Sequence, residues 1–130
     1  MLHSMAVNVM ENAYVPYSKF KVGVAIKSVN NKYYVGCNVE NAAYPQGICA
    51  EAGAISAMVA GGCNLISEVL VVSDGDRLIV PCGGCRQKLS EFSNSDTRIF
   101  LATIKKIEKT LLIRDLLPFS FDKRFLNFTE

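Results

Sequence analysis

Two short motifs about thirty residues apart carry side chains that bind metal ions. The first is a Cys-Ala-Glu sequence that begins at Cys49, and the second is a Pro-Cys-Gly-Gly-Cys sequence that ends at Cys85. A catalytic zinc site keeps three protein ligands and leaves its fourth position for water. Cys49, Cys82 and Cys85 supply three thiolates, and Glu51 is expected beside them as a proton carrier. The sequence therefore predicts a zinc site that can activate water.

Redox and purely structural roles account for these cysteines less completely. A Cys-x-x-Cys pair alone could be a redox motif, but redox chemistry does not explain a glutamate two residues after the first cysteine. A structural site with four cysteine ligands would need Cys37 or Cys63, and neither forms a second pair. The one histidine, His3, is close to the chain start and is not expected to be a ligand. Cys37 and Cys63 are expected to be small buried hydrophobic residues.

Both motifs fall where a loop is expected to turn into a helix. The first amide groups of a helix lack partners within it and carry partial positive charge, so they stabilise thiolates placed there. The small residues after Cys49 predict a helix that ends at Gly61 and packs closely on a sheet. Gly83 and Gly84 are expected to give the second turn the backbone freedom and small size that it needs.

Hydrophobic periodicity predicts an α/β fold in one domain, residues 1–130. Residues 68–73 are almost entirely apolar, as is typical of a strand buried on both faces. In chain order, the predicted elements are a helix over 2–13, strands over 20–26 and 33–39 that form a hairpin, a loop over 40–47, a helix over 49–60, a strand over 68–73, a helix over 82–92, a strand over 97–102 and a short helix over 111–117.

Composition limits the classes of partner. The chain has 130 residues, half of them apolar, and a net charge of +2. A nucleic-acid-binding domain usually has a far stronger basic patch, and the single basic cluster, residues 105–109, is interpreted as a solvated face. No apolar run is long enough to span a membrane, and five cysteines without an export signal favour reduced thiols in the cytoplasm. The three phenylalanines of the tail over residues 119–125 are expected to pack on the domain itself or on a neighbour.

Several motifs in order resemble those of the small, homotetrameric cytidine deaminases. They lie at residues 13–23, 36–44, 49–51, 81–87 and 116–121. The resemblance implies a three-layer α/β/α fold with a mixed central sheet and one Zn²⁺ per subunit. It also implies hydrolysis of cytidine and 2′-deoxycytidine to the uridines and ammonia, a reaction of pyrimidine salvage. A zinc-bound hydroxide would attack C4, while Glu51 carries a proton to ring N3 and then to the departing amino group.

The resemblance also implies how the nucleoside is held. Asn38 and Glu40 would bind the ribose 3′-hydroxyl, and Phe20 would pack against the base or ribose, although ordinary core packing also explains Phe20. The backbone amide of Ala50 would meet the pyrimidine carbonyl or the reacting centre. Tyr44 and Phe121 would reach the site of a neighbouring subunit across the tetramer interface.

Ala52 departs from the pattern of many relatives, which carry an arginine there that supports the thiolates. Helix-start amides and Arg86 would have to balance the thiolate charge in this chain. A Cys-Ala-Glu-Ala sequence also resembles blasticidin S deaminases, so a nucleoside-like antibiotic stays open as the substrate. Two other classes also stay open: a nucleic-acid-editing module on the same fold, and a structural zinc protein with no use for Glu51.

Overall fold

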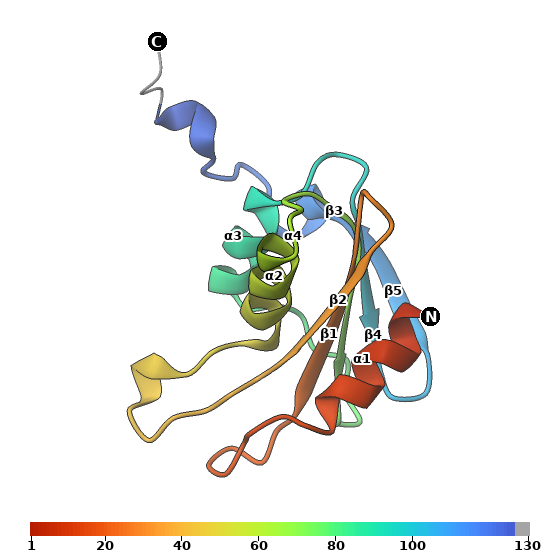
Figure 1. The fold of residues 1–130 in the computed structure, drawn as a ribbon, viewed down its shortest axis with the longest axis vertical. Helices are drawn as coiled ribbons and strands as arrows, with labels where there is room; N and C mark the ends of the chain where they lie inside the picture. The colour runs from red at the N-terminus through yellow and green to blue at the C-terminus, as the bar shows by residue number, and fades with distance from the viewer. Residues whose placement is uncertain (127–130) are drawn as a thin grey trace.

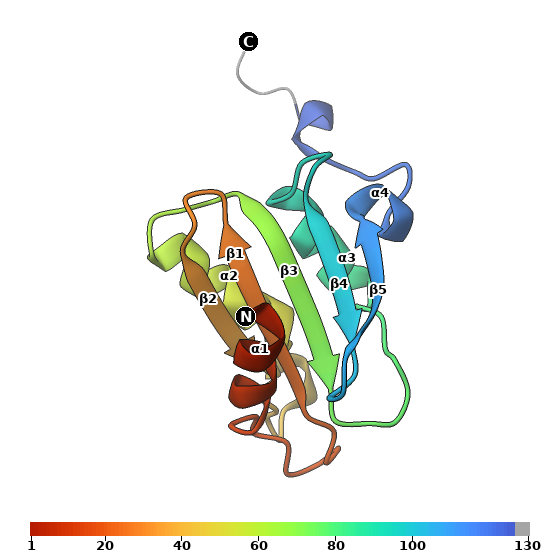
Figure 2. The same ribbon diagram turned by 90° about the vertical axis from the view of Figure 1, so that its right-hand side faces the viewer.

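Five strands of the chain form one mixed sheet in the computed structural model, which describes residues 1–126. The strand order is β2-β1-β3-β4-β5. Only β3 and β4 run parallel, and the other neighbouring pairs are antiparallel. The strands are β1 (Val22–Ser28), β2 (Tyr33–Cys37), β3 (Ile66–Ser73), β4 (Arg98–Ala102) and β5 (Ile107–Leu112), and Figures 1 and 2 show them from two sides.

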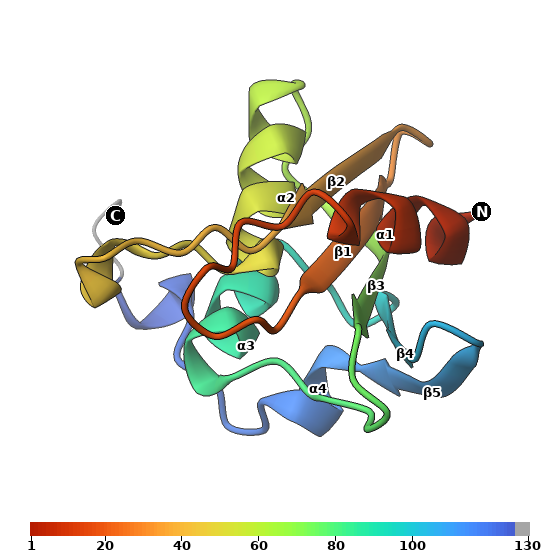
Figure 3. The same ribbon diagram turned by 90° about the horizontal axis from the view of Figure 1, so that it is seen from below.

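Helices cover both faces of this sheet. α1 (Leu2–Met10) lies on one face, and α2 (Ala50–Ala60) and α3 (Gly83–Glu91) lie side by side on the other, as Figure 3 shows. The short helix α4 (Ile113–Leu116) packs beside α3, and two short 3₁₀ turns cover Tyr44–Gln46 and Lys123–Phe125. The predicted three-layer α/β/α fold with a mixed sheet is confirmed. None of the helices in residues 1–126 is both long and apolar enough to cross a bilayer.

β3 is the strand that joins the two cores, because its alternate side chains point to opposite faces of the sheet. Val69 and Val71 belong to the core under α2 and α3. Leu70 and Val72 belong to the core under α1. All four are fully or almost fully buried, which confirms the predicted doubly buried strand.

Two strand glycines let the helices lie close to the sheet. A Cβ atom at Gly23 would meet Met10 Cβ of α1 at 2.8 Å. A Cβ atom at Gly36 would meet the backbone oxygen of Ala50 in α2 at 2.5 Å. The first turn of α2 therefore rests directly on the backbone of β2, and this contact fixes the position of the residues that begin the helix.

The C-terminal third differs from the prediction in one strand. Residues 107–112 form β5, whereas the sequence predicted a solvated basic stretch followed by a helix over 111–117. The helix is only α4, which has four residues. β5 pairs with β4 alone within the described chain, and its first four residues are exposed. Its charged Glu108 and Lys109 fit an edge strand, where charge discourages pairing with other chains, and they hide the alternation that identifies a strand.

The phenylalanine rings of the tail are not buried on their own domain, although Gln87 of α3 donates a hydrogen bond to the backbone oxygen of Phe121. Phe119 is fully exposed, and Phe121 and Phe125 are more than half exposed. The last two rings stack on each other with their centroids 5.5 Å apart. The packing of these rings on a neighbouring molecule stays a prediction.

Candidate active site

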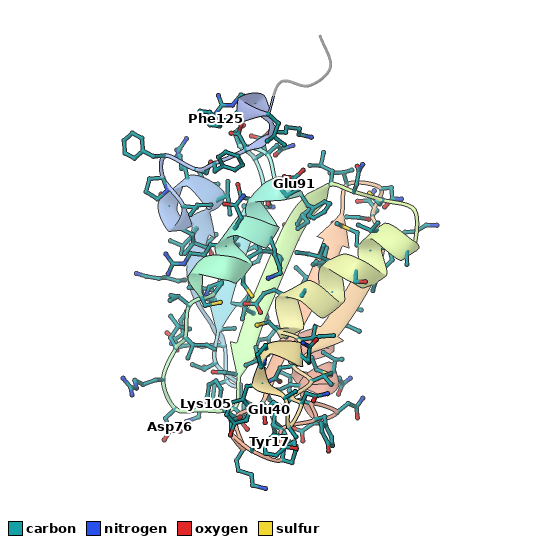
Figure 4. The ribbon with its side chains drawn as sticks, turned by 90° about the vertical axis from the view of Figure 1, so that its left-hand side faces the viewer. Tyr17, Glu40, Asp76, Glu91, Lys105 and Phe125 are labelled. Carbon is teal, nitrogen blue, oxygen red and sulfur yellow. The ribbon has the colours of Figure 1, made fainter. Side chains whose placement is uncertain are left out.

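The first turns of α2 and α3 bring the three predicted metal ligands together. Cys49 and Cys82 are the residues that cap the two helices, and Cys85 lies in the first turn of α3. Their three sulfur atoms all lie within 4.8 Å of one another. A tetrahedral zinc ion with Zn–S bonds of about 2.3 Å holds its sulfurs about 3.8 Å apart, so the donor set fits this ion. Figure 4 shows sulfur atoms gathered between the two helix starts.

The two cysteines of α3 have different environments. The pKa of the Cys82 thiol is lowered, first because the backbone amide of Cys85 faces its sulfur. Burial raises the pKa of the Cys85 thiol, and the negative charges of Glu51 and Cys49 raise it further. The helix start thus favours a thiolate at Cys82, as predicted, whereas a thiolate at Cys85 needs a cation beside it. A cluster of this kind is suited to hold a metal ion.

Glu51 lies beside the sulfur cluster and is buried, with only 5% of its surface exposed. It stands in the first turn of α2, and its negative charge acts on the thiols of both Cys82 and Cys85. Its carboxylate does not belong to the group of ligand atoms within 4.8 Å. This is the arrangement expected of a proton carrier that stands next to a metal rather than binding it.

The remaining cysteines and the histidine lie elsewhere. Within residues 1–126, neither Cys37 nor Cys63 joins the sulfur cluster, so nothing there supports a site with four cysteine ligands. Both are partly rather than fully buried, and Cys63 packs against the core under α2 and α3. His3 Nε2 lies 2.8 Å from the backbone oxygen of Thr103, at the other face of the sheet.

The predicted need for glycine in the second turn is wrong. Gly83 and Gly84 both lie in the first turn of α3, and neither has a positive φ angle. A Cβ atom at Gly83 would meet nothing within 4 Å, and one at Gly84 would come no closer than 3.8 Å to Lys88 Nζ. The turn therefore has room for side chains, because an ordinary helix start already places both sulfurs.

Two of the predicted nucleoside contacts, Asn38 and Phe20, are neighbours. The Asn38 side chain donates a hydrogen bond to the backbone oxygen of Phe20 and accepts one from the amide of Val22, each 2.9 Å long. Its amide group thus holds the start of β1 in place. The Phe20 ring is half-buried beside Gly75 and lines a cavity with the loop over residues 75–79.

Glu40 is held by the loop that precedes Phe20. Its Oε1 accepts hydrogen bonds of 3.1 Å from the amides of Tyr17 and Ser18, and its Oε2 accepts one from the Ser18 hydroxyl. The Ser18 hydroxyl is the main reason why the pKa of Glu40 is lowered from its ordinary value. Together with Tyr17, Ser18 and Tyr44, this carboxylate lines a cavity of about 390 Å³. The supporting role of Tyr17 and Ser18 was not predicted, because no local pattern in the sequence signals it.

The two residues expected to act across an interface are both exposed. Tyr44 is 78% exposed and Phe121 is 58% exposed. Figure 4 shows Phe125, whose ring stacks on that of Phe121, at the opposite end of the molecule from Glu40 and Tyr17. The tail of one chain therefore does not reach the cavity beside Glu40 of the same chain.

Arg86 binds two backbone carbonyl groups, and its expected part in balancing the thiolate charge stays a prediction. Its Nε donates to the backbone oxygen of Pro81 at 2.8 Å, and its Nη1 donates to that of Leu116 at 2.9 Å. In the described part of the chain these hydrogen bonds go to carbonyl groups and not to a cysteine sulfur. Helix-start amides, the other expected source of charge balance, do act on Cys82.

Comparison with known proteins agrees with this site. The model of the cytidine and deoxycytidylate deaminase zinc-binding region matches residues 1–102. A cytidine deaminase of Sporosarcina psychrophila is 41% identical over 119 residues, which cover 91% of this chain and 87% of that protein. One of Halalkalibacterium halodurans is 35% identical over 127 residues, which cover 98% and 96%.

A solved structure with this fold is the cytidine deaminase from Burkholderia pseudomallei. It superposes with a TM-score of 0.86 at 36% sequence identity, and the match covers 92% of this chain and 96% of that one. The matched zinc-binding region spans both cysteine motifs, so zinc is the metal that this site takes. The chain belongs to the zinc-binding family of cytidine and deoxycytidylate deaminases.

Proposed function

We propose that the protein hydrolyses cytidine and 2′-deoxycytidine to uridine and 2′-deoxyuridine, releasing ammonia, in pyrimidine salvage. The observation that carries this proposal is the cluster of three cysteine sulfurs with the buried Glu51 beside it. Cys49, Cys82 and Cys85 would hold the zinc ion. When bound, zinc supplies a Lewis acid that makes water a nucleophile near neutral pH.

Glu51 would move the protons of this reaction. Its carboxylate takes a proton from the attacking water and gives it to ring N3 of the pyrimidine, while the water oxygen bonds to C4. It then delivers the second proton to the amino group, which leaves C4 as ammonia. Glu51 itself is buried, and a positioned acid–base group of this kind contributes about 10²–10⁴-fold.

The nucleoside would be held by groups that its own chain has already oriented. Asn38 and Glu40 would bind the ribose 3′-hydroxyl. Each would use a donor or lone pair that its hydrogen bonds within the chain do not occupy. Phe20 would pack on the base or ribose. The amide of Ala50 would meet the base, because it belongs to the first helical residue and has no acceptor within α2.

The enzyme would act as a homotetramer, with residues 1–130 as one domain in each subunit. The exposed Tyr44 and Phe121 support this proposal, since a second chain would cover them and bring the tail to a neighbouring site. Three free thiols that must stay reduced to bind zinc fit the cytoplasm. A net charge of +2 gives no support to a nucleic-acid partner.

The test is the ultraviolet absorbance of cytidine mixed with purified protein at neutral pH. We expect a steady change to the uridine spectrum. Glu51→Gln should keep about one zinc per chain and lower the rate about 10²–10⁴-fold. The matched control is Glu91→Gln, at an exposed glutamate at the end of α3, which should keep the rate.

Two results would contradict the proposal. Full turnover in Glu51→Gln would remove this residue from the chemistry. No turnover by a wild-type protein that holds zinc would mean that the metal site is right and the substrate wrong, and blasticidin S would be the next substrate to test.

A further inference from the structure

Two consecutive residues of α3 hold the last residue of α4 and the segment that follows this helix. Arg86 Nη1 donates to the backbone oxygen of Leu116 at 2.9 Å. Gln87 Nε2 donates to the backbone oxygen of Phe121 at 3.0 Å. The tail, residues 117–126, is otherwise largely exposed. These two side chains therefore fix where the tail starts and which way it runs.

The same Arg86 side chain also holds the turn that carries two of the cysteine ligands. Its Nε donates to the backbone oxygen of Pro81 at 2.8 Å. Pro81 comes directly before Cys82, and Arg86 comes directly after Cys85. One guanidinium thus joins both ends of the turn over residues 81–85 and connects this turn to the start of the tail.

The chemistry of arginine suits this double contact. The guanidinium is planar and carries its donors in a fixed fork, so Nε and Nη1 can bind two carbonyl groups in set directions at once. A lysine has the same charge but a single flexible ammonium group. Pro81 and Leu116 are both buried, and a buried carbonyl without a donor destabilises the arrangement that leaves it unpaired.

We propose that Arg86 is a positioning residue that couples zinc retention in turn 81–85 to the placement of the tail, and that Gln87 fixes the tail alone. This inference rests on the proposed function, since it takes Cys82 and Cys85 as zinc ligands and the tail as part of a neighbour's site. Coupling is reciprocal: if an ordered tail favours the ligand-holding form of the turn, then zinc in the turn favours the ordered tail.

The experiment compares Arg86→Lys and Gln87→Ala in the zinc-loaded protein. The control is Arg114→Lys, the same substitution at an exposed arginine of α4. Zinc release is followed with a chromogenic chelator, and amide hydrogen exchange is followed in the tail. Arg86→Lys should speed zinc release about tenfold or more, the usual effect of losing a group that orients metal ligands, and should also speed exchange in the tail.

Gln87→Ala should separate the two effects. We expect faster exchange in the tail, a higher KM for cytidine and kcat within about twofold of wild type. Zinc release should speed up less than in Arg86→Lys, because the contacts of Arg86 with Pro81 and Leu116 remain. A role for Arg86 that is only electrostatic would make Arg86→Lys behave like wild type, and this result would overturn the proposal. If Arg86→Lys released zinc faster but left amide exchange in the tail unchanged, the proposed coupling between zinc retention and tail placement would be overturned.

A measurement on the unmodified protein covers the case in which Arg86→Lys does not fold. Removing zinc with a chelator should speed exchange in the tail. Equal exchange with and without zinc, in a wild-type protein that binds zinc and turns over cytidine, would overturn this inference and leave the proposed function intact. A wild-type protein that binds no zinc at all would overturn both.

Discussion

The two halves of the proposed active site are built differently. At the metal end, one chain supplies every group: Cys85 and Glu51 are buried, with 1% and 5% of their surfaces exposed, whereas Cys49 and Cys82 at the two helix starts are open to solvent. At the nucleoside end, Glu40 lines an open cavity, and Tyr44 beside it is 78% exposed. The tail, marked by Phe125 in Figure 4, lies at the opposite end of the molecule from Glu40.

This difference separates the groups that would perform the reaction from the surfaces that would enclose the nucleoside. Metal binding and proton transfer need positions accurate to a fraction of an ångström, and the residues proposed for them lie at two helix starts packed on one sheet. In the proposed function, holding and covering the nucleoside would use surfaces that a single chain leaves open. The comparison implies that changes at the metal end act on kcat and zinc content, whereas changes at the exposed end act on KM and on assembly.

The largest expected effect comes from removing a metal ligand. Cys85→Ala should lower zinc content well below one per chain and reduce turnover by about 10⁴-fold, because two thiolates do not complete the site. Cys63→Ala is the matched control at a partly buried cysteine outside the cluster, and it should keep zinc. Metal analysis and the cytidine assay measure both, and a zinc-loaded, active Cys85→Ala would contradict the assigned ligand set.

A second change acts on the metal end without touching a ligand. Gly36→Ala puts a methyl group against the Ala50 oxygen and forces the first turn of α2 away from β2. We expect a loss of about 1–3 kcal/mol in the free energy of unfolding. A shift of about 1 Å at Glu51 would also lower kcat about 10²-fold.

Gly83→Ala is the matched control for this steric effect, since nothing lies within 4 Å of the added methyl group. It should keep or slightly raise stability, because alanine is the better helix former. Thermal melting distinguishes the two variants. Equal stability of Gly36→Ala and wild type would show that the close contact does not position α2.

At the exposed end, Phe121→Ala should act on substrate binding and assembly. We expect KM for cytidine to rise about tenfold and the zinc content to stay unchanged. A tenfold rise corresponds to the loss of about 1.4 kcal/mol of binding free energy, as for a buried aromatic contact. Phe119→Ala is the comparison variant, because Gln87 of α3 binds the backbone oxygen of Phe121 and not that of Phe119. It should raise KM less than Phe121→Ala does. A purely monomeric, fully active enzyme in sedimentation would contradict the shared site.

The sequence predicted the metal end better than the exposed end for a physical reason. Cysteine spacing, helix starts and a doubly buried strand are local patterns, and the structure brings Cys49, Cys82 and Cys85 together as expected. β5 was missed because an edge strand carries charges in place of an alternating apolar pattern. The contacts of Arg86 and Gln87 were missed because they join residues 30 and 34 positions apart in sequence.

The smallest expected effect is a pH dependence at Glu40. The Ser18 hydroxyl and the amides of Ser18 and Tyr17 stabilise its ionised form, so its folded pKa is lower than in the unfolded chain. The contribution of these contacts is therefore fully present above the unfolded pKa of about 4.3 and is lost as pH falls through the lowered folded pKa. The amide signals of Tyr17 and Ser18 should titrate in NMR spectra with a midpoint below about 4.3.

Two variants test the cause of this midpoint. Glu40→Gln should abolish the titration of both amides, and Ser18→Ala should raise its midpoint, because the hydroxyl is the largest cause of the lowered pKa. A midpoint at or above the ordinary value in wild type would mean that the loop does not hold the carboxylate before substrate arrives. The low midpoint would instead show that the nucleoside end, although open to solvent, already has one rigid group in place within a single chain.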